Sequence, residues 1–196
     1  MLRLSSLVLA TLLMLNPALA HTGIGETTGF VHGFSHPVGG IDHVLAMVAV
    51  GLFAALRGGA ALWLVPAAFV TMMTVGGVLG MAGVGMPLVE IGIGLSVVVF
   101  GVAVALPRNV PLAAAMALVA FFAVFHGHAH GAEMPDTVSG FEYGIGFVLA
   151  TSMLHLAGIG LGLGIGKMGE LDGRRVARVA GGSMALAGVA ILAHLI

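Results

Sequence analysis

Residues 36–57 read HPVGGIDHVLAMVAVGLFAALR, and this stretch joins two imidazoles and a carboxylate directly to a long apolar run. The run from Val44 to Leu56 contains no charged side chain, and a charge inside such a segment is costly in lipid. His36, Asp42 and His43 stand at its amino-terminal end. The stretch therefore predicts the first membrane-spanning helix, with its polar groups gathered at one end.

The composition of the whole chain supports a membrane location. Of 196 residues, 59% are hydrophobic and only 8% are charged, and the mean hydropathy is +1.15. A soluble domain averages about 25% charged residues, so this chain lacks the polar surface to face water on all sides. The formal net charge of -1 argues against a nucleic-acid partner. The absence of cysteine excludes disulfides, thiolate metal sites, iron–sulfur clusters and cysteine nucleophiles.

Residues 1–20 have the features of a secretory signal peptide. Arg3 supplies a short basic start, residues 7–15 form an apolar run, and Ala18-Leu19-Ala20 fits a small-x-small cleavage pattern. Cleavage after Ala20 would make His21 the first residue of a single mature domain, residues 21–196. The alternative is an uncleaved first helix, although the apolar run is short for a span of about 20 residues.

The rest of the chain predicts an all-α fold, a polytopic bundle of six transmembrane helices. Residues 21–35 are rich in Gly and Thr and lack periodicity, which predicts an extramembrane arm. A hydrocarbon core of about 30 Å needs about 20 helical residues. Short connections with Gly, Pro or charged residues separate six apolar segments, at 37–57, 60–82, 88–106, 111–130, 141–166 and 175–196.

The basic residues predict the orientation of these spans. With the mature amino terminus outside, every Lys and Arg beyond residue 20 falls in or beside an inside loop, as the positive-inside rule requires. Most potential metal ligands then fall on the outer side: His21, His32, His36, Asp42, His43, Glu90, His126, His128, His130, Glu133, Asp136, Glu142 and His194.

Glycines at a spacing of four residues predict close helix packing. Gly158, Gly162 and Gly166 form one such row, Gly160 and Gly164 a second, and Gly76 with Gly80 a third. Small residues at this spacing let helix backbones approach closely in lipid. A sliding surface for a moving helix is the alternative interpretation.

A helix that begins at Pro37 would arrange the first polar group in a defined way. Proline suits the first helical position, so His36 would sit at the cap and His43 two turns below it on nearly the same face. Asp42 would lie about 100° around from His43. The alternative is that Asp42 caps or bonds a neighbouring helix while the histidines lie among the lipid headgroups.

A second polar group, FHGHAHGAE at residues 125–133, ends the fourth predicted span. His126 and His130 are four residues apart, so both can chelate one ion, and Glu133 shares their face if the helix continues. His128 points elsewhere. A solvated His-rich loop is the alternative. If the two groups meet, they form a site for a divalent transition metal with the ligands His36, Asp42, His43, His126, His130 and Glu133.

Five further residues are candidates for a metal or pathway role. His21 could chelate through its imidazole and α-amino group, and His32 and His128 lie on the same outer side. Glu90 follows Pro87 at a helix start, where capping alone could explain it. His155 falls near the middle of the fifth span, where an ionisable group is a functional candidate; a pathway or proton-relay role and a hydrogen bond to a neighbouring helix are both open.

The two motifs, HPVGGIDH at 36–43 and FHGHAHGAE at 125–133, resemble those of the HupE/UreJ family, and the resemblance covers essentially the whole chain. It implies a nickel, sometimes cobalt, permease of the bacterial cytoplasmic membrane that serves hydrogenase or urease maturation, with a periplasmic mature amino terminus. It also implies that His36, Asp42, His43, His126, His130 and Glu133 serve transport.

The sequence predicts a secondary permease rather than an enzyme or an ATPase. The chain contains no GxxxxGK[ST] motif, and a membrane potential of about 100 mV supplies about 4.6 kcal/mol to a dication. The expected partners are Ni²⁺ or Co²⁺ as cargo and the lipid bilayer, and no prosthetic group is expected. A homo-oligomer is a further possibility. Because metal binding needs neutral imidazoles, uptake should fail below a pH of about 6.5.

The sequence is also compatible with two other functions. A metal-binding accessory protein could hand its ion to a separate transporter. An intramembrane metal-dependent hydrolase could use the same ligands to activate water.

Overall fold

The structure is a computed structural model that describes residues 28–106 and 110–194, and all regular structure in these ranges is helical. The all-α prediction is therefore confirmed. The described helices are α2 (Gly29–Gly39), α3 (Ile41–Arg57), α4 (Ala61–Met81), α5 (Val89–Ala105), α6 (Leu112–Ala132), α7 (Gly140–Gly166) and α8 (Glu170–Leu192). The predicted signal peptide and His21 lie outside the described residues.

The helices identify the chain as a multi-pass membrane protein. Four of them, α4, α6, α7 and α8, are long and apolar enough to cross a membrane, and α2 with α3 would make a fifth crossing as a bent pair. The remaining apolar helix, α5, has 17 residues. Length and composition thus support four or five of the six predicted crossings.

The first predicted helix is broken, which corrects the sequence prediction. Residues 29–39 form α2 instead of an irregular arm, and Pro37 lies near the end of α2 instead of starting a helix. Gly40 is extended, with φ −98° and ψ 122°, and α3 leaves it at 82° to α2. Pro37 cannot donate a backbone hydrogen bond, and two glycines follow it, so the helix ends there. His36 and His43 therefore belong to different helices.

The amino-terminal helix α2 has a local start signal and a tertiary partner. The Oγ1 atom of Thr28 accepts a hydrogen bond of 3.4 Å from the backbone N–H of Val31, which caps the helix. Along its length α2 packs on α7, where glycines allow contact of the two backbones. A Cβ atom on Gly33 would lie 2.0 Å from the carbonyl oxygen of Tyr143. This tertiary packing explains a helix that the Gly-rich sequence does not predict.

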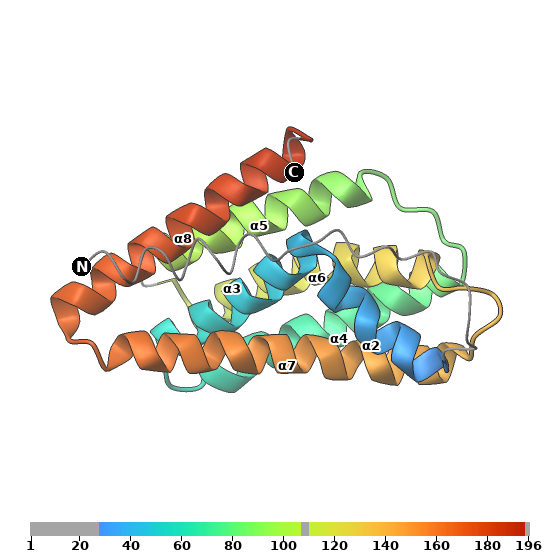
Figure 1. The fold of residues 1–196 in the computed structure, drawn as a ribbon, viewed down its shortest axis with the longest axis horizontal. Helices are drawn as coiled ribbons and strands as arrows, with labels where there is room; N and C mark the ends of the chain where they lie inside the picture. The colour runs from blue at the N-terminus through green and yellow to red at the C-terminus, as the bar shows by residue number, and fades with distance from the viewer. Residues whose placement is uncertain (1–27, 107–109, 195–196) are drawn as a thin grey trace, which may run out of the picture.

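Four helix pairs organise the bundle (Figure 1). The helix α4 packs most extensively on α6, α5 on α8, and α7 on both α2 and α3. Glycine permits the tightest of these approaches: a Cβ on Gly127 would lie 1.8 Å from the carbonyl oxygen of Met73, and one on Gly131 2.1 Å from that of Gly77. Such contacts match the small-residue packing expected between helices in lipid.

The glycine rows of the sequence are only partly used for packing. Gly76 and Gly80 face α6, and Gly158 and Gly162 face α3, as the close-packing interpretation predicts. The second row on α7 behaves differently: a Cβ on Gly160 or Gly164 would meet no described atom within 4 Å, and the same holds for Gly166 at the end of the first row. The spacing of the glycines predicts which of them line one face of a helix, but not which of these faces packs against a neighbouring helix.

The last helix begins earlier than predicted. Glu170 starts α8, so part of the expected polar turn before residue 175 is helical. Acidic residues occupy the first turn, where the helix dipole favours them. The guanidinium of Arg174 bonds the carboxylate of Glu170 one turn away, which adds a local contact to this exposed end.

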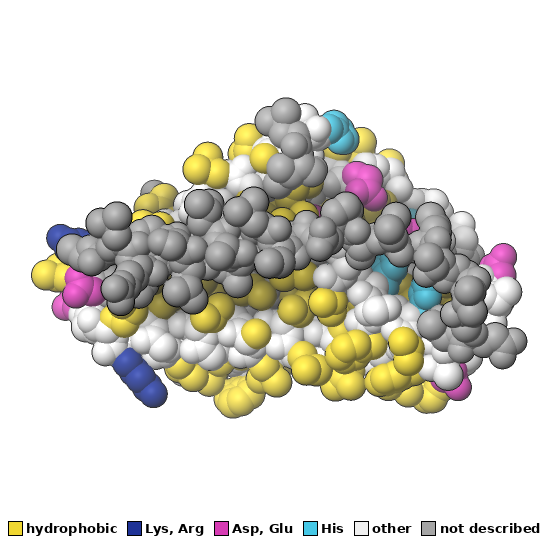
Figure 2. Space-filling view, viewed as in Figure 1, with side chains coloured by type: hydrophobic (Ala, Val, Ile, Leu, Met, Phe, Trp, Pro, Cys, Tyr) yellow, Lys and Arg dark blue, Asp and Glu magenta, His cyan; other side chains and the backbone are white. Residues whose placement is uncertain are grey.

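Basic and histidine side chains lie toward opposite ends of the bundle. On the face drawn in Figure 2, basic side chains gather where α7 meets α8, and histidines lie toward the other end. The course of α3 agrees, since it starts beside His43 and ends at Arg57. The Nη2 atom of Arg57 donates to the carbonyl oxygen of Val110 at 2.7 Å, which ties two connections together at the basic end.

Candidate metal centre

A compact group of three side chains lies at the end of the bundle away from the basic residues. His36 near the end of α2, His130 in the last turn of α6 and Glu133 just after α6 each offer a ligand atom, all within 4.8 Å of one another. His36 Nε2 lies 2.9 Å from Glu133 Oε2. Ligands that share one ion at about 2.0–2.2 Å stand roughly 3–3.5 Å apart, so small side-chain rotations would let all three bind it.

The burial of these three side chains forms a gradient. The side chain of Glu133 is 56% exposed and that of His36 is 31% exposed. His130 is only 2% exposed. The group therefore reaches from the surface into the bundle, so an ion that first meets the carboxylate can contact a buried imidazole without leaving the group.

Asp42 and His43 extend the group inward from the start of α3. The ring of His43 lies 4.2 Å from that of His130, centroid to centroid. Oδ1 of Asp42 accepts a hydrogen bond of 2.8 Å from the backbone N–H of His43 and lies 3.0 Å from its Nδ1. This contact favours a proton on Nδ1 and a free lone pair on Nε2, the arrangement by which a carboxylate orients a ligating histidine. Asp42 is thus placed to orient His43, outside the compact group of three.

His126 lies deeper in the same row. Its ring centroid is 4.8 Å from that of His43, and the residue is fully buried. Ser96 Oγ donates its single proton to the carbonyl oxygen of Ile93 at 2.6 Å and lies 2.8 Å from His126 Nε2. Because a hydroxyl has one proton, Nε2 must be the donor to Ser96, which leaves the Nδ1 lone pair of His126 free.

The six ligands predicted from the sequence are brought together, in a row built from three helices. Glu133, His36, His130, His43 and His126 follow one another in contact, with Asp42 beside His43. His126 and His130 are helical and buried, so the alternative of a solvated His-rich loop is wrong.

The other candidates lie at different distances from this row, which we call the histidine row. His32 is at its outer rim, with its ring 6.1 Å from those of both His36 and Tyr143. His128 points away, as predicted, and its Nε2 lies 2.6 Å from the carbonyl oxygen of Val84. Glu90 is exposed in the first turn of α5 and forms no ion pair or side-chain hydrogen bond with any residue in the described ranges. His155 is buried on α7.

Four residues that contact the histidine row were not predicted from the sequence. Ser96 bonds His126, and Phe69 packs against it with the ring centroids 5.7 Å apart. The hydroxyl of Tyr143 donates to the carbonyl oxygen of His130 at 3.1 Å, and the ring of Phe147 lies 4.3 Å from the imidazole of that residue. Tyr143 is the single tyrosine of the chain. Its rarity, and the isolated hydroxyl of Ser96 in an apolar helix, were the available signals.

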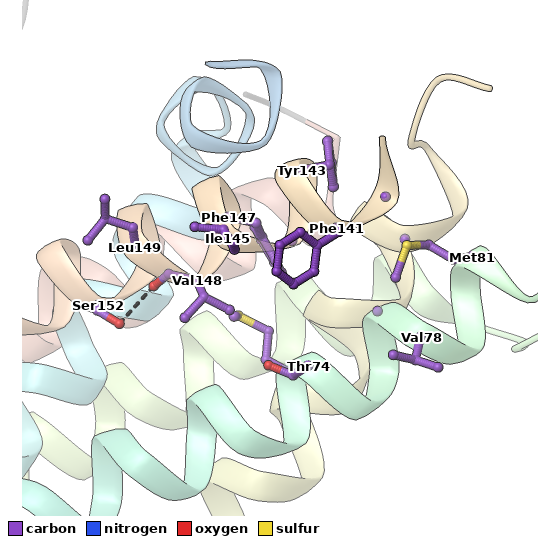
Figure 3. A pocket seen from close by; sticks show the side chains of 15 residues that line it. Thr74, Val78, Met81, Phe141, Tyr143, Ile145, Phe147, Val148, Leu149 and Ser152 are labelled. Atoms are coloured by element: carbon purple, nitrogen blue, oxygen red, sulfur yellow. Dashed lines mark hydrogen bonds between the residues drawn. The ribbon is translucent and has the colours of Figure 1, made fainter. Parts of the chain in front are cut away.

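A cavity lies between α4 and α7 (Figure 3), and no residue of the histidine row lines it. It has a volume of about 650 Å³ and an almost wholly apolar lining. Two of its polar side chains, Thr74 and Ser152, donate to carbonyl oxygens of their own helices. Tyr143 and Phe147 belong both to its wall and to the surroundings of His130. No imidazole or carboxylate lines this cavity, so it offers no metal site of the kind seen in the histidine row.

Comparison with known proteins agrees with the motifs and their contact. The family model described as HupE / UreJ protein matches residues 9–191. The chain is 46% identical over 178 residues to Protein HupE of Rhizobium leguminosarum bv. viciae, which covers 90% of this chain and 91% of that protein. No solved structure matches the chain. With nearly the full length matched, and with both of its characteristic motifs meeting in one site, the chain belongs to the HupE/UreJ family.

Proposed function

We propose that this protein is a secondary permease that imports Ni²⁺, or Co²⁺, through the histidine row. The observation that carries the proposal is the row itself, which leads from the exposed carboxylate of Glu133 to the buried imidazole of His126. HupE/UreJ is a transporter family associated with nickel uptake for hydrogenase and urease, and this supports transport over hydrolysis.

The ligand chemistry supports a transition-metal cargo. Imidazoles with one or two carboxylates suit Ni²⁺, Co²⁺, Zn²⁺ and Cu²⁺, whereas Mg²⁺ and Ca²⁺ prefer sites made of oxygen atoms. The exposed Glu133 attracts the cation, and His36 and His130 replace part of its hydration shell. His43, held by Asp42, then offers its Nε2 lone pair as the next ligand.

In the proposed topology the chain crosses the cytoplasmic membrane six times, with α5 as the additional crossing. A helix of 17 residues is about 25 Å long and can span a locally thinned bilayer. The histidine row then faces the outside and the basic end faces the cytoplasm, as the positive-inside rule favours. A potential of about 100 mV, negative inside, supplies about 4.6 kcal/mol to each entering dication.

Reconstitution of the purified protein into liposomes tests this function. With an inside-negative potential, we expect vesicles that contain this protein alone to accumulate nickel, measured with a trapped metal-sensitive dye. An accessory protein that hands its ion to a separate transporter would bind nickel but leave the vesicle interior free of it. That result would contradict the permease.

Asp42→Asn tests whether the carboxylate that orients His43 is needed for transport. The substitution keeps the shape of the side chain but removes the charge that holds His43 Nδ1–H, so nickel uptake should fall about 10–100-fold. Uptake per folded molecule is the measurement. Wild-type rates in this variant would remove Asp42 from the mechanism.

His128→Ala should leave nickel binding within about twofold of wild type, because His128 points to Val84 and away from the histidine row. Loss of its hydrogen bond should lower the free energy of unfolding by about 1 kcal/mol. Calorimetric titration with Ni²⁺ and thermal unfolding in detergent give the two values. A large loss of nickel affinity would place His128 among the ligands.

A further inference from the structure

We infer that His126 and His155, whose rings both lie against the ring of Phe69, form a second, inner metal station below the capture group of His36, His130 and Glu133. The inference rests on the proposed permease function. It assigns a role to a buried histidine that the outer site does not use.

Polar atoms without a hydrogen-bond partner in the bundle interior are the first observation that supports the inner station. In residues 28–106 and 110–194, nine buried side-chain nitrogen and oxygen atoms lack a hydrogen-bond partner. Seven of these atoms belong to His43, His126, His130, Thr151 and His155. Native proteins pair nearly all such atoms, since each unpaired one costs about 1–3 kcal/mol. Their concentration on these five residues indicates that they are kept for a ligand.

His155 is the clearest case among them. It is 2% exposed, and both of its ring nitrogens lack a partner. The alternative role of this residue is an interhelical hydrogen bond, and no described group makes one with it. An ionisable side chain inside a membrane helix is functional by default, and this neutral imidazole has one N–H and one lone pair that no described group uses.

One face of α7 connects His155 with the outer site. Phe147, Thr151 and His155 follow at intervals of four residues and therefore lie on the same face of the helix. Phe147 contacts the ring of His130, and His155 contacts the ring of Phe69, with centroids 5.1 Å apart. Eight residues correspond to about 12 Å along the helix, so His155 lies about that much deeper than Phe147.

The ring of Phe69 links the two imidazoles of the inner station. It is fully buried, with its centroid 5.7 Å from that of His126 and 5.1 Å from that of His155, and its plane is at 88° to the imidazole of His155. Both imidazoles therefore lie beside one apolar ring in the bundle interior, where no water-exposed side chain competes for the ion.

The inner station fits a weakly held transition-metal dication. Its ligands are two neutral imidazoles, with the hydroxyl of Thr151 one turn above His155, and no carboxylate contacts either ring in the described part of the chain. Imidazole suits Ni²⁺ and Co²⁺, but without an anionic ligand the charge is not compensated. A path that conducts must bind each ion weakly enough to release it. The outer group contains the carboxylate of Glu133, so it should bind the dication more tightly than the inner station.

The test compares His155→Leu with the matched control Ser152→Ala. Ser152 lies on the same helix, and its hydroxyl bonds only its own backbone at Val148. Equilibrium nickel binding to the purified protein reports the outer group and counts folded molecules, and uptake into proteoliposomes reports passage. We expect His155→Leu to bind nickel like wild type while uptake per folded molecule falls at least about tenfold. Its melting temperature should stay equal or rise, because an unpaired polar group is replaced by an apolar one.

Three outcomes distinguish the inner station from the permease function on which it rests. Intact binding with reduced uptake in His155→Leu, and normal uptake in Ser152→Ala, would support the inner station. Normal uptake per folded molecule in His155→Leu would overturn the station and leave the permease standing. Wild-type vesicles that exclude nickel would overturn the permease and the station together.

Discussion

Replacing His130 by alanine is expected to lower the affinity for Ni²⁺ on the order of a hundredfold and to stop uptake. His130 contacts both parts of the outer site, with His36 at 4.7 Å and His43 at 4.2 Å between ring centroids. Without this imidazole, the exposed pair of His36 and Glu133 is cut off from the buried residues. The loss should therefore exceed that of any substitution at the rim.

Equilibrium dialysis with Ni²⁺ and vesicle uptake measure this effect, and His128→Ala is the matched control. The two histidines lie two residues apart on α6 and are both buried, but only His130 lies in the histidine row. Equal losses in the two variants would show a general effect of shortening a side chain on α6. Unchanged affinity in His130→Ala would remove the compact group as the capture site.

Gly127→Val is expected to destabilise the protein by about 3 kcal/mol or more, so that little folded protein accumulates in the membrane. A Cβ on Gly127 would stand 1.8 Å from the carbonyl oxygen of Met73, and this backbone has no rotamer that avoids the clash. The helices α4 and α6 would have to separate. Because α6 carries His126 and His130, nickel binding should be lost with the fold.

Gly160→Val provides the comparison on α7, where an added Cβ meets no described atom within 4 Å. Both substitutions place a β-branched residue inside a helix, so their difference isolates the helix contact. Thermal unfolding in detergent and the amount of membrane-inserted protein are the measurements. Similar stability of the two variants would mean that α4 and α6 do not approach this closely.

Residue type and membrane topology were sufficient to predict much of the candidate site. The two polar groups fall on the same side of the predicted bundle, and the spacing of His126 and His130 places both on one helical face. The structure brings Asp42, His43 and the α6 histidines into one row, as that reasoning requires. The metal-binding role of these residues stays a prediction.

The break at Gly40 and the helix before it could not be predicted, because both depend on tertiary contacts. A proline followed by two glycines fits equally a helix start after an irregular arm and the end of an earlier helix. Packing of Gly33 on α7 decides between them. The roles of Phe69 and Ser96 were hidden for a similar reason: each lies in an apolar helix, and only the fold shows which residues face His126.

The 82° bend between α2 and α3 has an electrostatic consequence for ion entry. A helix carries about half a negative charge at its carboxyl end and half a positive charge at its amino end. His36 lies in the last turn of α2, so a cation there meets the negative end, while Asp42 lies in the first turn of α3, at the positive end. The two backbone dipoles can thus stabilise the cation and the carboxylate separately, by about 0.3–1 kcal/mol each, which one continuous helix could not do.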